Sequence, residues 1–167
     1  MLTNDILIDD FERIKEEVHA TLNGLRQADL TFRPGPEANS IAWLIWHLTR
    51  IQDDHIASAA GTEQVWTADG WARQFNLPFD DASTGYGHTS QEVAAVQATP
   101  QQLLGYYDAV HARTVEYIRD LTDDDFNRIV DTSFDPPVTL ATRVVSVVSD
   151  DLQHIGQAAF VRGLLPH

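Results

Sequence analysis

Residues 39–55 read N-S-I-A-W-L-I-W-H-L-T-R-I-Q-D-D-H and predict an α-helix with a well-defined start. Asn39 or Ser40 can serve as the N-cap, because a short side-chain oxygen accepts hydrogen bonds from the free amides of the first turn. No glycine or proline interrupts the pattern before Gly61, a residue type suited to the position just after a helix. Apolar residues recur at helical spacing and predict a buried stripe: Ile41, Leu44, Leu48 and Ile51.

His47 lies on this apolar stripe, one turn after Trp43 or Leu44 and one turn before Ile51. An imidazole directed at a protein core needs a partner, because burying an unpaired polar group costs roughly 1–3 kcal/mol. We therefore expect a residue from another part of the chain to contact His47.

Three further segments carry helical patterns, and together with the first they predict an all-α four-helix bundle. They cover about residues 5–23, then a helix from Thr99-Pro100 to about residue 121, and a last helix from about residue 139 to 165. Residues 27–38 are expected to form an extended connector and residues 131–137 a loop, and no segment predicts a convincing strand. The pattern predicts one domain over residues 1–167.

A long irregular insert, residues 61–98, separates the second and third long helices. It is rich in aromatic residues and in glycine and proline, and a short helix is expected near residues 68–75. Segments of this length inside a compact domain are usually functional, for example as a cover over a pocket. The aromatic residues predict that this one packs against the bundle.

The composition excludes several kinds of site and partner. The 167 residues include no cysteine, which excludes disulfides, thiolate metal ligands and a cysteine nucleophile. The net charge of −14 repels phosphate backbones, so nucleic-acid binding is not expected. No apolar run reaches the ~18 residues of a membrane span, and the first residues do not resemble a signal peptide. We expect a cytoplasmic protein without a membrane partner.

The last predicted helix carries an acid and an imidazole one turn apart. Asp150 and His154 stand at i and i+4 and share a face with Gln157. A buried carboxylate needs a cation or several hydrogen-bond donors, because its desolvation is otherwise prohibitive. His47, Asp150 and His154 together would form a three-ligand site for a divalent metal between facing helices. Zn²⁺ is the first candidate for this donor set, and Ni²⁺, Fe²⁺ and Mn²⁺ are alternatives.

Two other arrangements fit the same spacing. Asp150 could pair with His47 or His154 in a buried ion pair that contains no metal. Asp151 stands three residues before His154 and could face the bundle interior in place of Asp150. Spacing alone leaves these alternatives open.

Other ionisable residues are expected to lie outside the site. His19 is expected to be exposed or half-exposed, and His111 to lie in the core or at its boundary. His88, in the irregular insert, is expected to face solvent. Asp54 lies two turns from His47 on a similar face and is expected to be a solvated acid.

Around His47, and again around Asp150 and His154, the sequence resembles the DinB-like superfamily. This superfamily includes the mycothiol-dependent maleylpyruvate isomerase and related bacterial thiol transferases. Residues 25–48, L-R-Q-A-D-L-T-F-R-P-G-P-E-A-N-S-I-A-W-L-I-W-H-L, are similar to the family's loop into helix two, which ends in its first metal histidine. Residues 150–165, D-D-L-Q-H-I-G-Q-A-A-F-V-R-G-L-L, are similar to its final metal helix with the ending H-x-G-Q-x-x-x-x-R-G.

The resemblance implies a four-helix bundle with a divalent metal, often zinc or nickel, held by three residues. His47 matches the first ligand and His154 the last. Asp150 matches the middle ligand, which is a histidine or glutamate in many members and is longer than aspartate. Family members frequently dimerise through helix faces, so the resemblance also implies a homodimer.

The activity that the resemblance implies is a metal-dependent S-transfer. The protein would conjugate a low-molecular-weight thiol, of the mycothiol or bacillithiol type, to a small electrophilic substrate. The sequence assigns no separate catalytic base. The alternatives are a metal-dependent hydrolase, in which the same metal activates water, and a non-enzymatic metal-binding protein of a stress response.

Overall fold

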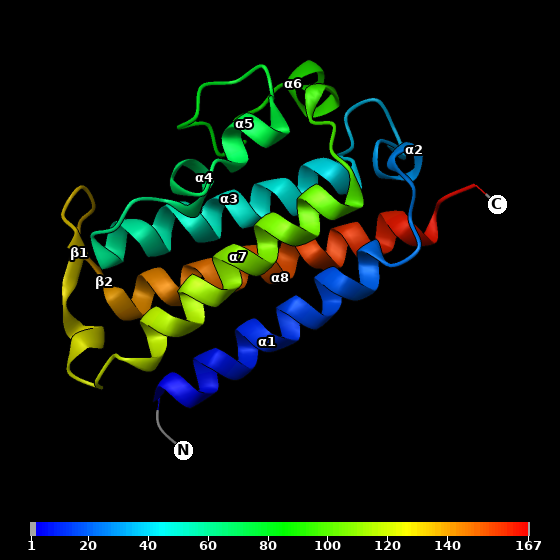
Figure 1. Cartoon of the computed structure of the whole chain (residues 1–167). Coiled ribbons are helices and arrows are strands. Elements are labelled where there is room, and N and C mark those ends of the chain that lie inside the picture. The colour runs from blue at the N-terminus through cyan, green and yellow to red at the C-terminus, as the bar shows by residue number, and fades with distance from the viewer. Residues whose placement is uncertain (1–2, 167) are drawn as a thin grey trace.

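The computed structural model describes residues 3–166, which form four long helices packed side by side (Figure 1). These helices are α1 (Thr3–Leu22), α3 (Ile41–Ala60), α7 (Pro100–Arg119) and α8 (Leu140–Gly163). The most extensive contacts join α3 to α8 and α1 to α7. The predicted all-α four-helix bundle is therefore confirmed, and α3 and α8 are the neighbours that can build a shared site.

Short polar side chains set the starts of three of the long helices. Ser40, not Asn39, caps α3, and its hydroxyl oxygen accepts from the Trp43 amide at 3.1 Å. Thr99 and Thr139 cap α7 and α8 in the same way. Gly61 ends α3 with a φ of 69°, a left-handed conformation in which glycine carries no Cβ penalty.

The first half of α3 is buried on all sides, because every residue from Ile41 to Arg50 is buried. The sequence predicted only one apolar stripe on this helix. The stripe faces the other long helices, where its residues join those of α1, α7 and α8 in one core. A helix that is buried all round needs cover on its second side as well. Residues of the insert supply this cover, since Trp66, Phe75 and Val93 belong to the same core.

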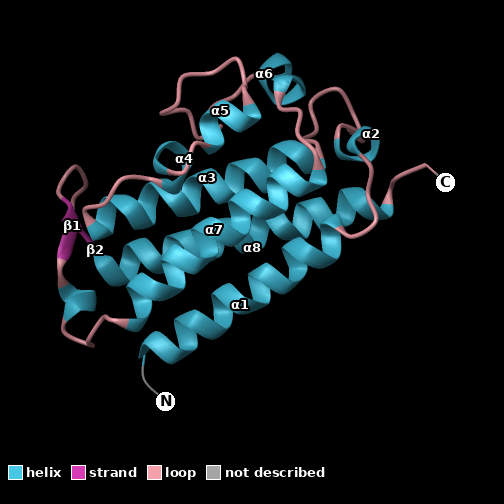
Figure 2. Ribbon diagram, in the orientation of Figure 1, coloured by secondary structure: helices cyan, strands magenta, loops and turns pink. Residues whose placement is uncertain are grey.

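The insert between α3 and α7 contains three short helices, α4 (Val65–Ala68), α5 (Trp71–Phe75) and α6 (Ser90–Ala95). Figures 1 and 2 show these helices and their long loops lying over α3. The short helix expected near residues 68–75 begins at Trp71, because Gly70 takes a left-handed conformation before it. The connector also differs from its predicted extended form, since it contains the one-turn helix α2 (Gln27–Leu30).

A small antiparallel sheet that the sequence did not predict flanks the loop expected at residues 131–137. It joins β1 (Ile129–Asp131) to β2 (Val138–Thr139), after the short 3₁₀ helix η1 (Asp125–Asn127). Asp131 accepts from the backbone and hydroxyl of Ser133 and so closes the turn between the strands. Strands of two or three residues carry too little alternation to be recognised in a sequence.

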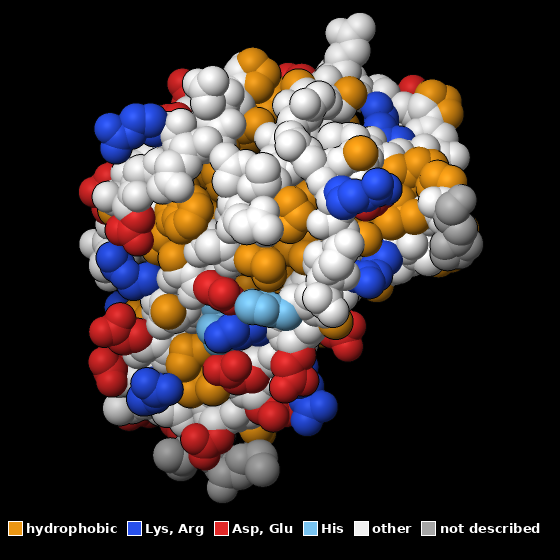
Figure 3. Space-filling model, turned by 45° about the vertical axis from the view of Figure 1, so that its right-hand side comes forward, with side chains coloured by type: hydrophobic (Ala, Val, Ile, Leu, Met, Phe, Trp, Pro, Cys, Tyr) orange, Lys and Arg blue, Asp and Glu red, His pale blue; other side chains and the backbone are white. Residues whose placement is uncertain are grey.

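The visible surface agrees with the charge of the chain. Figure 3 shows acidic side chains spread over this face, and histidine side chains that reach the surface among acidic and basic ones. Of the helices within residues 3–166, none combines the length and the apolar character needed to cross a membrane.

Candidate metal centre

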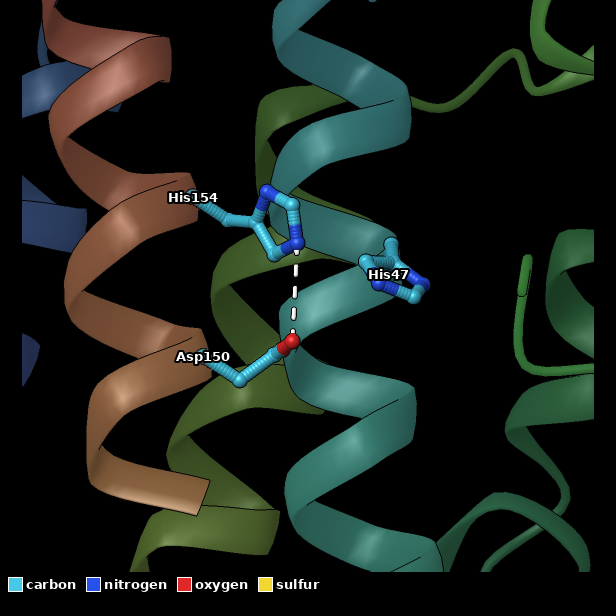
Figure 4. Close-up of side chains that lie close together, drawn as sticks. All are labelled: His47, Asp150 and His154. Carbon is cyan, nitrogen blue, oxygen red and sulfur yellow. Dashed lines mark ion pairs between the residues drawn. The ribbon is translucent and has the colours of Figure 1, made fainter. Parts of the chain in front are cut away.

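His47, Asp150 and His154 converge between α3 and α8. Asp150 and His154 extend from α8 towards α3, where His47 lies (Figure 4). Each of the three offers a ligand atom, and these atoms all lie within 4.8 Å of one another. His47 therefore lies beside two residues of the last helix, about 100 residues further along the chain, while its hydrogen-bond partner is the Thr84 carbonyl of the insert.

His47 is held so that one ring nitrogen stays available. Its Nδ1–H donates to the backbone carbonyl of Thr84 at 2.6 Å, which leaves the lone pair of Nε2 free in the neutral ring. The indole of Trp43 stacks on the imidazole, with ring centres 4.5 Å apart. Burial lowers the pKa of His47, and the nearby His154 lowers it further. Both effects favour the neutral imidazole, which is the form that binds metals.

His154 presents the equivalent nitrogen from the other side. Its Nδ1 lies 2.9 Å from the side-chain oxygen of Gln157, one turn further along α8. A neutral ring donates from Nδ1 to this oxygen and keeps the lone pair of Nε2 towards Asp150. Burial lowers the pKa of His154, but Asp150 and Gln157 outweigh burial, so that the pKa is raised overall.

Asp150 has an oxygen that no other group satisfies. Its Oδ2 is buried and has no hydrogen-bond partner among residues 3–166. Its Oδ1 lies 3.6 Å from Nε2 of His154, which is longer than a hydrogen bond. The alternative of a completed ion pair without metal therefore leaves a carboxylate oxygen unpaired. Two imidazole nitrogens and one carboxylate are ligands that Zn²⁺ and related divalent metals accept, so the residues present fit a metal.

Asp151 is the more deeply buried of the two adjacent acids, but it does not join the histidines. Its side chain is fully buried, and neither of its oxygens has a hydrogen-bond partner in the described part of the chain. Burial raises the pKa of Asp151 well above its ordinary value, and the charge of Asp150 adds to the effect. Asp151 does face the interior of the bundle, as that alternative proposed. It does not replace Asp150, which is the acid that lies with His47 and His154.

The remaining candidates lie elsewhere, as the sequence predicted. His19 is half-exposed and pairs with Asp108 at 2.7 Å. His111 is buried beside Glu12. Asp54 accepts a hydrogen bond from Gln64 and is partly exposed.

His88 differs from its predicted solvent-facing position. Its Nδ1 accepts from the Trp43 indole at 3.2 Å, and its ring stacks on Trp46. In the neutral ring Nε2–H donates to the Ser83 hydroxyl, 3.1 Å away. Burial lowers the pKa of His88 and favours this neutral form. His88 therefore ties the insert to α3 beside the metal centre.

Sequence analysis missed a buried polar network one turn from His47. Arg50 is fully buried and donates to the side chains of Gln64 at 2.7 Å and Tyr106 at 3.2 Å. The carboxylate of Asp53 lies 3.7 Å from Arg50 and accepts from the Tyr106 hydroxyl at 2.8 Å and from the amides of Val65 and Trp66. The only signal in the sequence was an arginine and an aspartate at i and i+3 in a helix whose preceding half is apolar.

A groove lies between the end of the connector, the first turn of α3 and the second half of α8, and none of His47, Asp150 and His154 lines it. Its volume is about 630 Å³. Leu44, Phe160 and Val161 give it apolar walls, and Gln157 joins it to His154. Glu37 at its rim makes the groove unfavourable for an anionic ligand. The groove suits a small, largely apolar molecule, and Gln157 is the residue that links it to the three converging side chains.

Fold and site together define a helical bundle with a candidate metal centre between two long helices. Residues 10–158 match the family model of the DinB superfamily, and the chain belongs to this superfamily. A crystal structure described as the conserved protein of locus from Enterococcus faecalis has 30% sequence identity and a TM-score of 0.92, covering 98% of this chain and 97% of that one. A search of curated proteins gave no match. Membership of the superfamily supports a metal-associated, DinB-like protein.

Proposed function

We propose that this protein is a divalent-metal-dependent S-transferase that conjugates a low-molecular-weight thiol to a small electrophile. His47, Asp150 and His154 would hold the metal, with Zn²⁺ as the first candidate. The observation that carries the proposal is the convergence of His47, Asp150 and His154, whose ligand atoms lie within 4.8 Å of one another. One ring nitrogen of each histidine is already hydrogen-bonded, and Oδ2 of Asp150 is buried without a partner among residues 3–166. Such a donor set is incomplete without a cation.

The chain's own residues would hold and shield this site. The Thr84 carbonyl and the Gln157 amide oxygen orient the two imidazole rings, as outer partners of metal ligands commonly do. Trp43 covers the ring of His47 and keeps water from that side. A divalent cation held by three protein ligands keeps a position for a thiol or water and lowers the pKa of the group bound there.

The groove beside His154 supports a small electrophile as the second substrate. Leu44 and Gln157 line the groove, Leu44 one turn before His47 on α3 and Gln157 hydrogen-bonded to His154. An electrophile in the groove would reach the metal past these two residues. The thiol of the mycothiol or bacillithiol type is proposed from the family resemblance.

Thiol consumption with a defined metal content tests this function. The full-length protein is analysed for bound metal as purified, stripped, and reloaded with Zn²⁺ or Ni²⁺. We expect loss of bacillithiol or mycothiol with 1-chloro-2,4-dinitrobenzene to be faster with the loaded protein than with buffer or the stripped protein. An unchanged rate of thiol loss under every metal loading would refute the transferase. Turnover of an ester under the same loadings, without thiol, would favour the hydrolase instead.

A further inference from the structure

The insert contacts α3 along the face that carries His47. Residues 43, 47 and 50 stand at i, i+4 and i+7, so their side chains share one face of the helix. All of them hydrogen-bond to residues 81–88 of the insert: Trp43 to His88 at 3.2 Å, His47 to Thr84 at 2.6 Å, and Arg50 to the carbonyls of Ser83 at 3.1 Å and Asp81 at 3.2 Å. This short segment is therefore bound to the helix on both sides of His47.

Gly85 brings the backbone of the segment directly against the imidazole. It adopts a φ of 92°, which side chains rarely tolerate. A Cβ at this position would lie 2.9 Å from Nδ1 of His47, 3.0 Å from the Trp46 ring and 3.2 Å from the Trp43 ring. These neighbours are buried rings with no room to retreat, so a side chain at residue 85 would push the segment away from His47.

Gly87 provides the contrast within the same turn. Its φ is 76°, so it too holds a left-handed conformation. A Cβ at Gly87 would have no described heavy atom within 4 Å. A side chain at residue 87 therefore strains the backbone in the same sense but leaves the space around His47 free.

Arg50 keeps the segment in place from the core. Its guanidinium is fully buried and also bonds to Gln64 and Tyr106. The two insert carbonyls that it binds precede Thr84 by one and three residues. The position of the Thr84 carbonyl is thus fixed by the buried network as well as by His47 itself.

We propose that residues 81–88 are the positioning element of the metal centre and that Gly85 is the residue on which this role depends. The segment presents the Thr84 carbonyl to Nδ1–H of His47 and so directs Nε2 towards Asp150 and His154. The inference rests on the proposed metal-binding role of His47. Removing an outer partner of a metal ligand typically lowers metal affinity 10- to 100-fold. Because coupling is reciprocal, metal binding must in turn stabilise the segment.

Paired alanine variants test the proposal by their Zn²⁺ affinity. Gly85→Ala and Gly87→Ala are measured beside the wild-type full-length protein by isothermal titration calorimetry with Zn²⁺ alone. We expect Gly85→Ala to bind about 10- to 100-fold more weakly and Gly87→Ala to stay within about threefold of the wild type. Equal affinities of the two variants would overturn the positioning role. A wild-type protein that takes up no Zn²⁺ would instead refute the metal centre itself, and so the proposed function.

Hydrogen exchange of the wild-type protein decides the matter if Gly85→Ala does not fold. Amide exchange of residues 81–88 is followed by mass spectrometry with and without saturating Zn²⁺. This segment includes the His88 amide, which donates to the Gly85 carbonyl at 3.1 Å. We expect exchange there to slow at least threefold when Zn²⁺ binds. Zn²⁺ binding without any change of exchange in the segment would contradict the proposal.

Discussion

Two polar clusters lie one turn apart on α3, and they differ in how completely their members satisfy each other. Both charged groups of the Arg50–Asp53 cluster are buried. Arg50 donates to the Ser83 carbonyl and the Gln64 side chain, and Asp53 accepts from the Val65 amide and the Tyr106 hydroxyl. Around His47, one carboxylate oxygen of Asp150 is buried without a partner within the described residues. The first cluster is complete within the described residues, whereas the second leaves a carboxylate oxygen that a bound cation would satisfy.

The Arg50–Asp53 cluster therefore has a structural role, whereas the cluster around His47 is a candidate binding site. Buried polar groups that complete one another fix the relative positions of helices and loops. Converging ligand atoms that lack a hydrogen-bond partner indicate a candidate site for a bound ligand. Both clusters use the same helix, and the insert connects them through residues 81–88. Substitutions in the two clusters should therefore differ in whether they lower stability or metal affinity.

The largest effect is expected from Arg50→Met, which opens the completed network. It leaves the buried carboxylate of Asp53 without its cation and frees the Ser83 and Asp81 carbonyls. Removing one partner of a buried ion pair costs about 3–5 kcal/mol. We expect the free energy of unfolding, measured by urea denaturation of the metal-free protein, to fall by this amount. A loss below about 1 kcal/mol would show that the network contributes little to stability.

A loss of metal affinity rather than of stability is expected from His154→Ala. The change removes one of the three converging ligands, and we expect Zn²⁺ affinity to fall at least ~100-fold, or about 2.7 kcal/mol. The urea midpoint of the metal-free protein should change little, because the polar partners of His154 lie on its own helix and its contacts with α3 are edge-on ring contacts with Trp43 and His47. His19→Ala is the matched control, since His19 is half-exposed and pairs with Asp108. Equal Zn²⁺ affinities of both variants and the wild type would contradict the ligand assignment.

The smallest effect, and one of opposite sign, is expected from Asp151→Asn. The folded-state pKa of Asp151 is raised by burial, so its contribution to stability is complete below the unfolded pKa of about 3.9 and is lost as pH rises towards the folded value. At neutral pH the neutral amide removes this cost, and we expect the free energy of unfolding to increase by about 1–2 kcal/mol. Urea denaturation at about pH 4 and pH 7 checks the sign.

The pH dependence of that variant is the decisive part of the measurement. The gain from Asp151→Asn should shrink at the lower pH, where Asp151 of the wild type is protonated in the folded state and about half protonated in the unfolded state. If the free energy of unfolding rises by the same amount at both pH values, burial of the charged Asp151 carboxylate does not destabilise the wild type.

Local patterns in the sequence were sufficient to predict the four-helix bundle. Ser40, Thr99 and Thr139 cap helices that carry apolar stripes, and the structure places helices at these positions. The pair of strands and the one-turn helix α2 were not predicted, because two to four residues carry no readable period. Their hydrogen bonds depend on residues brought together by turns.

The candidate site could be predicted only in part from the sequence. His47 on an apolar stripe and the spacing of Asp150 and His154 predicted a convergence that the structure contains. The roles of Thr84 and Gly85 could not be read, because a backbone carbonyl and a glycine in a long insert carry no spacing signal. Their importance comes from the close approach of the insert to α3.

Residue types and contacts a few positions apart are sufficient to predict the helices, their caps, the absence of thiolate ligands and the two histidines available for a metal. They do not distinguish Asp150 from Asp151. The packed bundle places Asp150 with the histidines and Asp151 in the core. Adjacent residues on a helix point about 100° apart, so the rotation of α8 against α3 makes this choice, and the packing of the whole bundle sets that rotation.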